Sequence, residues 1–290
     1  GPPEAVPRGT ARVTWLIVGG AGYVGSHIVH EMHNAGLPVV VIDDLSSGAA
    51  TALPDEVPLK VADACDAGAV GTFMQEHAVS GVIHLAAYKH ARESVVNPLM
   101  YWRNNIGALL GVLEAAASSH VQSLVLSSSC SVYGSVGEVG AYTPLSPESP
   151  YANTKAASEA LLQDWSRATG VDWAVLRYFN VAGNARFPFA PDRSQECVIP
   201  AMATRIAEGE RPVVFGADFE TADGSALRDY VDVRDVARAH LLVAHDLSRH
   251  ARSVSRGKIL SVSTGSPTSV LTIVRLVSEL MGWRGEPEIS

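Results

Sequence analysis

Short runs of aliphatic and β-branched residues alternate with helical stretches along the first 180 residues of the chain. A strand–helix–strand–helix order implies a parallel sheet that is covered by helices on both faces. We therefore expect an α/β fold with a doubly wound parallel sheet. The expected strands are 13–18, 38–42, 59–62, 82–85, 124–128 and 173–177, and the expected helices are 23–34, 69–77, 98–119 and 150–169.

The alternation stops after Asn180, where Pro, Gly and Asp gather in 184–194 and again in 216–224. We expect a main domain over 11–180 and a smaller substrate-binding lobe over 181–290. Residues from about 228 to 262 are expected to return to the main sheet. Ligands of open α/β sheets bind beyond the carboxyl ends of the strands. Within 181–290 we expect a helix at 199–208, a strand at 213–215, and further segments at 230–242, 259–262 and 270–280.

The first expected strand runs into a glycine-rich turn, Gly19-Gly20-Ala21-Gly22-Tyr23-Val24-Gly25, and then into a helix. Glycines at these spacings allow a tight turn and a close approach of pyrophosphate to the backbone, as in Rossmann-type domains. The second strand ends at Asp43, where a carboxylate can accept hydrogen bonds from ribose hydroxyls. No arginine follows Asp43 to bind a 2′-phosphate, so the sequence favours NAD over NADP.

Tyr151 and Lys155 stand four residues apart, just after a helix start at Ser149-Pro150. They share one helix face, and a lysine beside a phenol should lower the phenol pKa from its usual value of ~10. Ser129 ends an upstream strand and could complete a catalytic triad. Alone, the pair could be a surface pair and the serine could bind backbone, but the glycine turn favours the catalytic interpretation.

The net charge of −8 argues against a protein that grips nucleic acid or an anionic membrane. No apolar stretch approaches the ~20 residues of a membrane span. The cysteines at 65, 130 and 197 lack metal-ligand spacing, so we expect no metal site and free thiols in the cytoplasm. His27, His30 and His33 recur on one helix side, which favours packing or solvent exposure over metal binding.

Several longer segments resemble the extended short-chain dehydrogenase/reductase superfamily and, more specifically, the UDP-glucose (UDP-galactose) 4-epimerase family. The most specific are Leu-Arg-Tyr-Phe-Asn-Val-Ala-Gly at 176–183 and Asp-Gly-Ser-Ala-Leu-Arg-Asp-Tyr at 223–230. The resemblance covers nearly the whole chain. Its other segments are 18–26, 41–45, 84–98, 102–107, 127–134 and 149–155.

The resemblance implies a bound NAD, a UDP-sugar substrate, and the catalytic residues Ser129, Tyr151 and Lys155. The sugar nucleotide would be contacted by Ser129, Tyr151, Asn180, Cys197, Val198, Val213, Phe215 and Arg228. The family has a more polar residue and then leucine where this chain has Cys197 and Val198. NAD would be contacted by Gly19, Gly22, Tyr23, Val24, Gly25, Asp43, Asp44, Leu45, Ser46, Ser47, Gly48, Asp63, Ala64, Leu85, Ala86, Ala87, Lys89, Asn104 and Phe179.

The implied reaction is C4 epimerisation of a UDP-hexose, with or without an N-acetyl group, through a transient 4-keto sugar. Dehydratases of the superfamily carry Asp-Glu where this chain has Cys130-Ser131, and that difference favours epimerisation. Another enzyme acting on nucleotide sugars, or a non-catalytic NAD-sensing protein, remains an alternative. The family continues past Ser290 with an Arg-x-Gly-Asp motif, and the 133–151 connection is short here. A homodimer through a four-helix contact of 98–119 and 150–169 is expected.

Overall fold

The computed structural model describes residues 13–140, 142–184, 189–192, 194, 196–216, 218–249 and 257–290. Seven strands form one parallel sheet in the order β11-β6-β5-β4-β1-β2-β3. This confirms the predicted doubly wound α/β fold. The strands are β1 Thr14–Val18, β2 Val39–Asp43, β3 Leu59–Val61, β4 Val79–His84, β5 Ser123–Ser129, β6 Asp172–Tyr178 and β11 Gly257–Val262.

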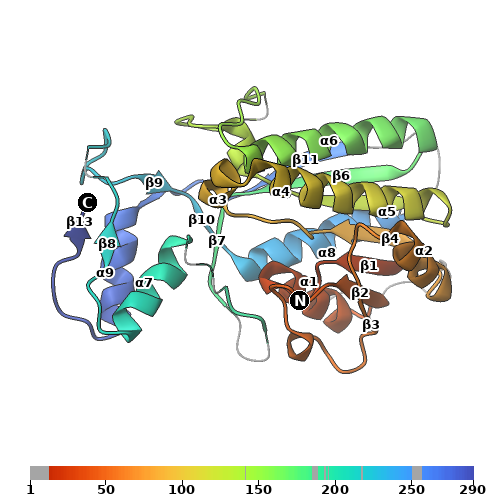
Figure 1. Ribbon diagram of the computed structural model, residues 1–290, viewed down its shortest axis with the longest axis horizontal. Coiled ribbons are helices and arrows are strands. Elements are labelled where there is room, and N and C mark those ends of the chain that lie inside the picture. The colour runs from red at the N-terminus through yellow and green to blue at the C-terminus, as the bar shows by residue number, and fades with distance from the viewer. Residues whose placement is uncertain are drawn as a thin grey trace.

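Helices cover both faces of this sheet (Figure 1). On one face lie α2 (Ala67–Glu76), α5 (Gly107–Ala117) and α6 (Pro150–Thr169), and on the other lie α1 (Tyr23–Asn34) and α8 (Val233–Arg249). Residues of β1 alternate between the two hydrophobic cores: Leu16 packs into the first and Ile17 into the second, both fully buried. The strands are therefore apolar on both sides, as buried parallel strands require.

The helix expected at 98–119 is interrupted. It consists of α4 (Pro98–Tyr101), a π-helical turn η2 (Trp102–Ile106) and α5, and it follows a short α3 (Ala91–Val96). π turns inside helices often occur at functional sites. The helix expected at 150–169 is confirmed as α6: the Ser149 side chain accepts a hydrogen bond from the Ala152 amide, and Gly170 ends the helix in the left-handed conformation.

The chain beyond Asn180 builds a smaller set of elements around its own apolar cluster, seen at the end of Figure 1 that holds α7 and α9. Its helices α7 (Val198–Ala207) and α9 (Val270–Leu280) pack together through Met202, Leu271 and Val274. Three short pairings complete this region: β7 (Asn180–Ala182) with β10 (Tyr230–Asp232), β8 (Val213–Val214) with β13 (Glu288–Ile289), and β9 (Leu227–Arg228) with β12 (Thr268–Ser269).

The segment expected at 230–242 splits into β10 and the long helix α8, which packs against α1. β11 lies beside β6 at the edge of the main sheet. Short 3₁₀ turns are η1 (Ala50–Ala52) and η3 (Cys130–Tyr133). The chain therefore passes back to the main sheet between α7 and α9, while the division into two domains at residue 180 remains a prediction.

Candidate active site

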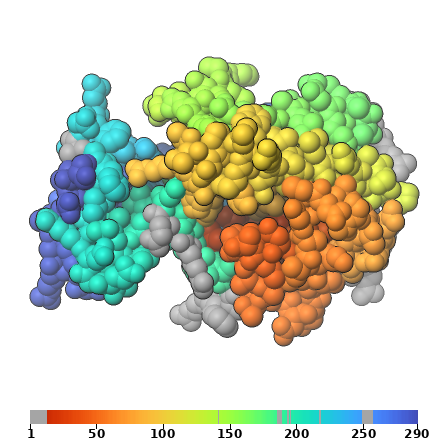
Figure 2. Space-filling view, in the orientation of Figure 1, coloured from red at the N-terminus to blue at the C-terminus, as the bar shows by residue number. Residues whose placement is uncertain are grey.

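A cleft of about 1050 Å³ lies at the carboxyl ends of the main strands. One wall is built from the ends of β1, β2, β4, β5 and β6, and the other from α7, β8, β9 and β10. In Figure 2 the surface is hollowed between the orange and yellow segments and the blue-green region of α7. The main sheet and the smaller region thus both contribute to one site.

The glycine turn forms one end of the cleft. Gly19 has a φ of +82°, and a Cβ on Gly25 would lie 2.2 Å from the Gly19 carbonyl oxygen. Gly22 is the N-cap of α1 and has no side chain to cap the helix amides. A Cβ there would meet no protein atom closer than 3.5 Å. Helix amides that face a cleft in this way suit the pyrophosphate of a dinucleotide.

Asp43 stands beside the glycine turn with an exposed fraction of 7%. Its two carboxylate oxygens accept hydrogen bonds from the amides of Ala21 (2.9 Å) and Leu45 (2.8 Å). Burial raises the pKa of this carboxyl, and the two amide bonds counter that effect. The oxygens line the cleft, where they can accept bonds from ribose hydroxyls and would repel a 2′-phosphate. The residues present fit NAD.

Ser129, Tyr151 and Lys155, predicted to act together, all line the cleft. Ser129 Oγ accepts a hydrogen bond from the Ser131 amide at 3.1 Å, and the Ser129 side chain lies near enough to Tyr151 to lower the pKa of the phenol. Lys155 Nζ donates to the Ser127 carbonyl at 2.9 Å. The end of β5 and the first turns of α6 therefore converge on one point of the cleft.

One electrostatic prediction for this triad is wrong. Burial raises the pKa of Tyr151 to about 12, while the neighbouring Ser129 side chain opposes the rise and the nearby Cys130 and Cys197 add to it. Burial also lowers the pKa of Lys155 to about 8. Desolvation disfavours the charged form of both groups, and the Lys155 ammonium is engaged with the Ser127 carbonyl. In this structure Lys155 does not bring the phenol into the neutral range.

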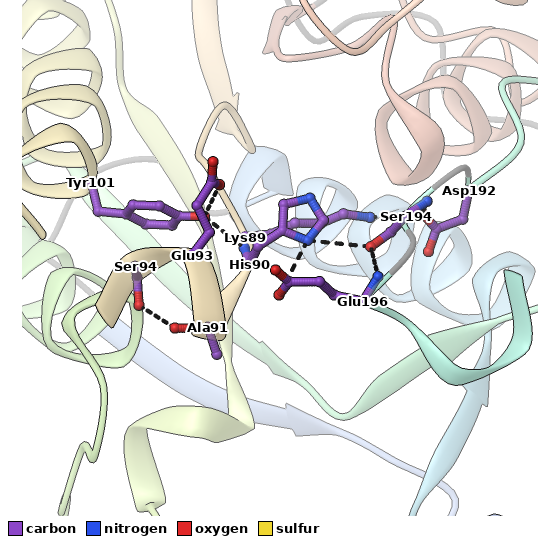
Figure 3. Close-up of polar contacts among 9 residues, drawn as sticks. All are labelled: Lys89, His90, Ala91, Glu93, Ser94, Tyr101, Asp192, Ser194 and Glu196. Atoms are coloured by element: carbon purple, nitrogen blue, oxygen red, sulfur yellow. Dashed lines mark hydrogen bonds and ion pairs between the residues drawn. The ribbon is translucent and has the colours of Figure 1, made fainter. Parts of the chain in front are cut away.

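The loop after β4 is tied to the segment before α7 (Figure 3). Lys89 Nζ pairs with Asp192 at 3.0 Å, and His90 Nδ1 lies 3.2 Å from Ser194 Oγ and 3.7 Å from Glu196. These contacts join two walls of the cleft. Lys89, predicted to bind the cofactor, faces the cleft with its ammonium already paired.

The opposite wall holds the residues predicted to face the sugar nucleotide. Arg228 is exposed, and its Nη1 donates to the Leu227 carbonyl at 2.7 Å. Asn180 Nδ2 donates to the Asp229 carbonyl at 3.1 Å. The Arg92 guanidinium lies 5.1 Å from the ring centre of Phe215, so α3 and the end of β8 approach each other across the cleft.

Most predicted site residues line this cleft, and two do not. Leu45 packs against the second hydrophobic core, and its φ of 59° shows a left-handed turn. A Cβ on Gly48 would lie 2.7 Å from the Ala21 backbone, so glycine is required there by close packing. Their predicted cofactor contacts stay predictions. The predicted residues that line the cleft are Gly19, Gly22, Tyr23, Val24, Gly25, Asp43, Asp44, Ser46, Ser47, Asp63, Ala64, Leu85, Ala86, Ala87, Lys89, Asn104, Ser129, Tyr151, Lys155, Phe179, Asn180, Cys197, Val198, Val213, Phe215 and Arg228.

Sequence reasoning missed a buried polar layer beneath the triad. Tyr178 Oη lies 2.7 Å from Ser127 Oγ and 2.6 Å from His240 Nε2. Asn105, next to the predicted Asn104, joins the Tyr88 backbone to Thr154 of α6. The motif Leu-Arg-Tyr-Phe-Asn contains Tyr178, but its partners come from elements distant in sequence.

Within the described residues, no group of three or more His, Cys, Asp or Glu side chains could hold a metal ion. No helix in the described ranges is long and apolar enough to cross a membrane. His27 and His30 contact the ring of Phe189, with ring centres 4.2 and 4.5 Å away, which agrees with a packing role.

Comparison with known proteins points to one family. Residues 15–255 match the NAD dependent epimerase/dehydratase family. The chain is 37% identical to a UDP-glucose 4-epimerase of Azospirillum brasilense over 278 residues, which is 92% of this chain and 77% of that protein. The UDP-glucose 4-epimerase of Brucella ovis, solved with NAD, superposes with a TM-score of 0.87 at 32% identity, covering 96% and 85% of the two chains.

A further structure, the UDP-Glc/GlcNAc 4-epimerase of Campylobacter jejuni, gives a TM-score of 0.82 at 28% identity and covers 96% and 86% of the two chains. Each of these two alignments covers 96% of this chain, so the similarity includes residues of both walls of the cleft. Fold, glycine turn and comparisons agree: the chain belongs to the NAD dependent epimerase/dehydratase family and, within it, to the UDP-glucose 4-epimerase group.

Proposed function

We propose that this protein catalyses the NAD-dependent epimerisation of a UDP-hexose at C4 through a transient 4-keto sugar. One observation carries the proposal. Ser129, Tyr151 and Lys155 meet in the same cleft as the glycine turn, and Arg228 stands on its opposite wall. A dinucleotide and a sugar diphosphate can therefore meet at one reactive group.

NAD would be held by the first turn of α1 at its pyrophosphate and by Asp43 at a ribose. Lys155 and Phe179 would contact its nicotinamide end. When bound, NAD would supply a nicotinamide ring that can take up and give back a hydride, and this ring is positively charged in its oxidised form. The protein supplies position and electrostatics for that chemistry.

Tyr151 is the group that would move the proton of the sugar 4-hydroxyl at its phenolic oxygen. In the absence of the charged nicotinamide ring, the pKa of Tyr151 is about 12, so the phenol is protonated at neutral pH. A cation within ~4–6 Å favours the phenolate, and the cofactor ring would act in that direction. Ser129, whose side chain lies beside Tyr151, would hydrogen-bond the same sugar oxygen.

The UDP-sugar would lie along the opposite wall. Arg228 keeps several N–H donors beside its bond to Leu227, and guanidinium groups bind phosphate through paired hydrogen bonds. Asn180, Val213 and Phe215 would contact the nucleotide, with Cys197 and Val198 at the start of α7 beside it. Because the sugar would be held mainly through its diphosphate, the 4-keto ring could turn and present its other face to the hydride.

A direct assay tests the reaction and the sugar. The protein is incubated with UDP-galactose and, separately, with UDP-N-acetylgalactosamine, and the products are followed by NMR. The expected product is the C4 epimer, and NAD is expected from the denatured protein. A 4-keto-6-deoxy or unsaturated sugar among the products would show that the protein catalyses another reaction of nucleotide sugars and not epimerisation. An NAD-sensing role would follow if no sugar nucleotide were converted.

We also infer a homodimer. Apolar side chains are exposed on α3, α4, η2 and α5, and these elements lie beside α6 in Figure 1. Such a row on a helical surface suits an isologous helix contact. Light scattering should give twice the chain mass, and Val96→Glu should give the monomer. The exposed apolar side chains of this surface are Val95, Val96, Leu99, Trp102 and Leu110.

Two further expectations belong to this proposal. The division into a main domain (11–180) and a smaller lobe (181–290) is supported by the separate apolar cluster of α7 and α9. A cytoplasmic location is supported by Cys65, Cys130 and Cys197, which are all free thiols. Limited proteolysis and cell fractionation would test them.

A further inference from the structure

Glu159 lies four residues after Lys155 and eight after Tyr151, so the three side chains follow one face of α6. Its side chain has an exposed fraction of 2%, and that of its ion-pair partner Arg177 has one of 8%. Arg177 Nε donates to Glu159 Oε1 at 3.0 Å, and Nη2 donates to Oε2. A two-point, buried carboxylate–guanidinium pair of this kind fixes both distance and orientation.

The pair also reaches the strand that ends in Ser129. Ser128 Oγ donates to Glu159 Oε1, and Ser128 lies opposite Arg177 in the β5–β6 ladder. Arg177 Nη1 donates to Tyr133 Oη at 2.9 Å, and the guanidinium lies 4.8 Å from the centre of the Tyr133 ring. Tyr133 closes the 3₁₀ turn that begins directly after Ser129. The pair therefore hydrogen-bonds to Ser128 and Tyr133, which lie on either side of Ser129 in the chain.

We propose that Glu159 and Arg177 are positioning residues of the epimerase, which lock α6 against β5 and β6 and keep Lys155 in its ammonium form. They do not line the cleft, so they would act through Lys155 and Ser129 and not on the substrate. This inference rests on the proposed function, because the triad is assigned by it. It adds two residues to the apparatus that holds that triad in place.

The electrostatic part follows from the groups that face Lys155. Burial lowers the pKa of Lys155 to about 8, and the Glu159 carboxylate on the same helix raises it. From β4, His84 faces Lys155, and its own pKa, lowered by burial and by the lysine charge to about 3, makes it neutral. From β5, the Ser127 carbonyl accepts a hydrogen bond from the ammonium. Glu159 is the one negative charge among these groups that stabilises the ammonium.

The geometric part follows from the cost of an unpaired buried charge. Removing one partner of a buried ion pair leaves the other without solvation or a counter-charge, whereas replacing both by neutral groups of similar volume is often tolerated. Glu159→Gln alone would therefore strain the fold. The double variant Glu159→Gln/Arg177→Met removes both charges and separates the electrostatic effect from misfolding.

Two readouts test the pair. The first is the titration of Lys155 Nζ by NMR of isotope-labelled protein, which needs no substrate. The second is the pH dependence of kcat and KM with UDP-galactose. The ammonium is present below its pKa and lost above it, so a lower Lys155 pKa moves the alkaline limb of activity to lower pH. The double variant removes both charges of the pair, but only Glu159 is among the groups that shift the Lys155 pKa, so the limb should move by about one pH unit to lower pH.

Asp164→Asn is the matched control, because Asp164 lies on the same helix and pairs with Arg167 while 72% exposed. It should change neither readout. Glu159→Asp keeps the carboxylate, so its alkaline limb should lie at the wild-type pH. Its kcat should be lower, because the shorter side chain moves the carboxylate away from Arg177. Wild-type titration and pH profile in the double variant would overturn the proposal. If the wild type turns over no sugar nucleotide, the proposed function fails, and the NMR titration alone still decides whether Glu159 holds the proton on Lys155.

Discussion

The two walls of the cleft differ in how much protein stands behind them. Behind Ser129, Tyr151 and Lys155 lie the two large hydrophobic cores of the main sheet and a layer of buried polar bonds. Behind Arg228 and Phe215 lies a cluster with four buried residues, from α7, β8 and α9. Both side chains on that wall are exposed, and Phe215 has an exposed fraction of 58%.

The rigid wall and the exposed wall suit two different requirements of the reaction, chemistry at C4 and binding of a sugar that turns. Hydride and proton transfer need reacting groups held within a fraction of an ångström, and rigid buried elements provide that. Binding a sugar that must turn between two half-reactions needs anchoring at the diphosphate and freedom elsewhere. A wall with a small core and exposed contacts is suited to that requirement. Changes on the triad wall should therefore act on kcat, and changes on the lobe wall should act on KM.

The largest effect is expected from Tyr151→Phe, which removes the proton-carrying oxygen and keeps the ring. General acid–base catalysis contributes about 10²–10⁴-fold, so kcat should fall by roughly that factor. NAD content should not change, because the pyrophosphate and ribose contacts lie elsewhere in the cleft. Turnover of UDP-galactose and the NAD released from denatured protein measure the two quantities. If the variant kept activity within tenfold of wild type, a residue other than Tyr151 would have to act as the base.

The triad wall was also the part that the sequence predicted best, for a physical reason. The glycine turn, Asp43, and the Tyr151–Lys155 spacing are local patterns whose geometry follows from a turn or a helix alone. The Glu159–Arg177 pair depends on how β5 and β6 lie in register beneath α6, with Ser128 opposite Arg177. Such a contact between separate elements cannot be read from spacing.

The electrostatics of the triad could not be predicted either, since burial outweighs the neighbouring charge. The spacing of Tyr151 and Lys155 predicts a lowered phenol pKa, yet the pKa is raised to about 12. Desolvation depends on how many elements enclose a group, which a single helix face does not reveal. The π turn at 102–106 was missed for a similar reason, because its residues also fit an ordinary helix.

Two leucine-to-alanine substitutions compare the hydrophobic core of the main sheet with the apolar cluster of α7 and α9. Leu109 is fully buried in the core beneath α5, and Leu271 has an exposed fraction of 8% in the cluster of α9. Leu109→Ala should lower the free energy of unfolding by about 2–5 kcal/mol, and Leu271→Ala should fall at or below the low end of that range. Urea unfolding measures both.

The two leucine substitutions should also differ in their effect on substrate binding. Leu271→Ala should raise KM for UDP-galactose while NAD content stays at the wild-type level, because α9 supports the lobe wall only. Leu109→Ala should leave KM unchanged in the molecules that remain folded. Equal losses of stability from both variants, with NAD lost in each, would mean that the two walls form one cooperative unit.

Arg228→Ala tests the anchoring role of the lobe wall directly. Loss of charge-assisted bonds to a diphosphate should raise KM by roughly ten- to a hundredfold with a smaller change in kcat. Arg275→Ala is the control. Arg275 is an arginine on α9 that is 62% exposed, and its guanidinium makes only a long ion pair of 4.0 Å with Glu286. Competition by free UDP should weaken in parallel for Arg228→Ala. An unchanged inhibition constant for UDP would remove Arg228 from the phosphate site.

The smallest effect is expected from the thiol beside the triad. Burial raises the pKa of Cys130 to about 11, so its reactive thiolate form is scarce at neutral pH. Cys130→Ala should keep kcat within about threefold, a difference below ~1 kcal/mol. Alkylation of the wild type should accelerate with rising pH as the thiolate forms, and Cys130→Ala should slow the resulting inactivation. A loss of kcat comparable to that of Tyr151→Phe would instead mean that the thiol takes part in proton transfer, and the triad wall would then hold one more reacting group than Ser129, Tyr151 and Lys155.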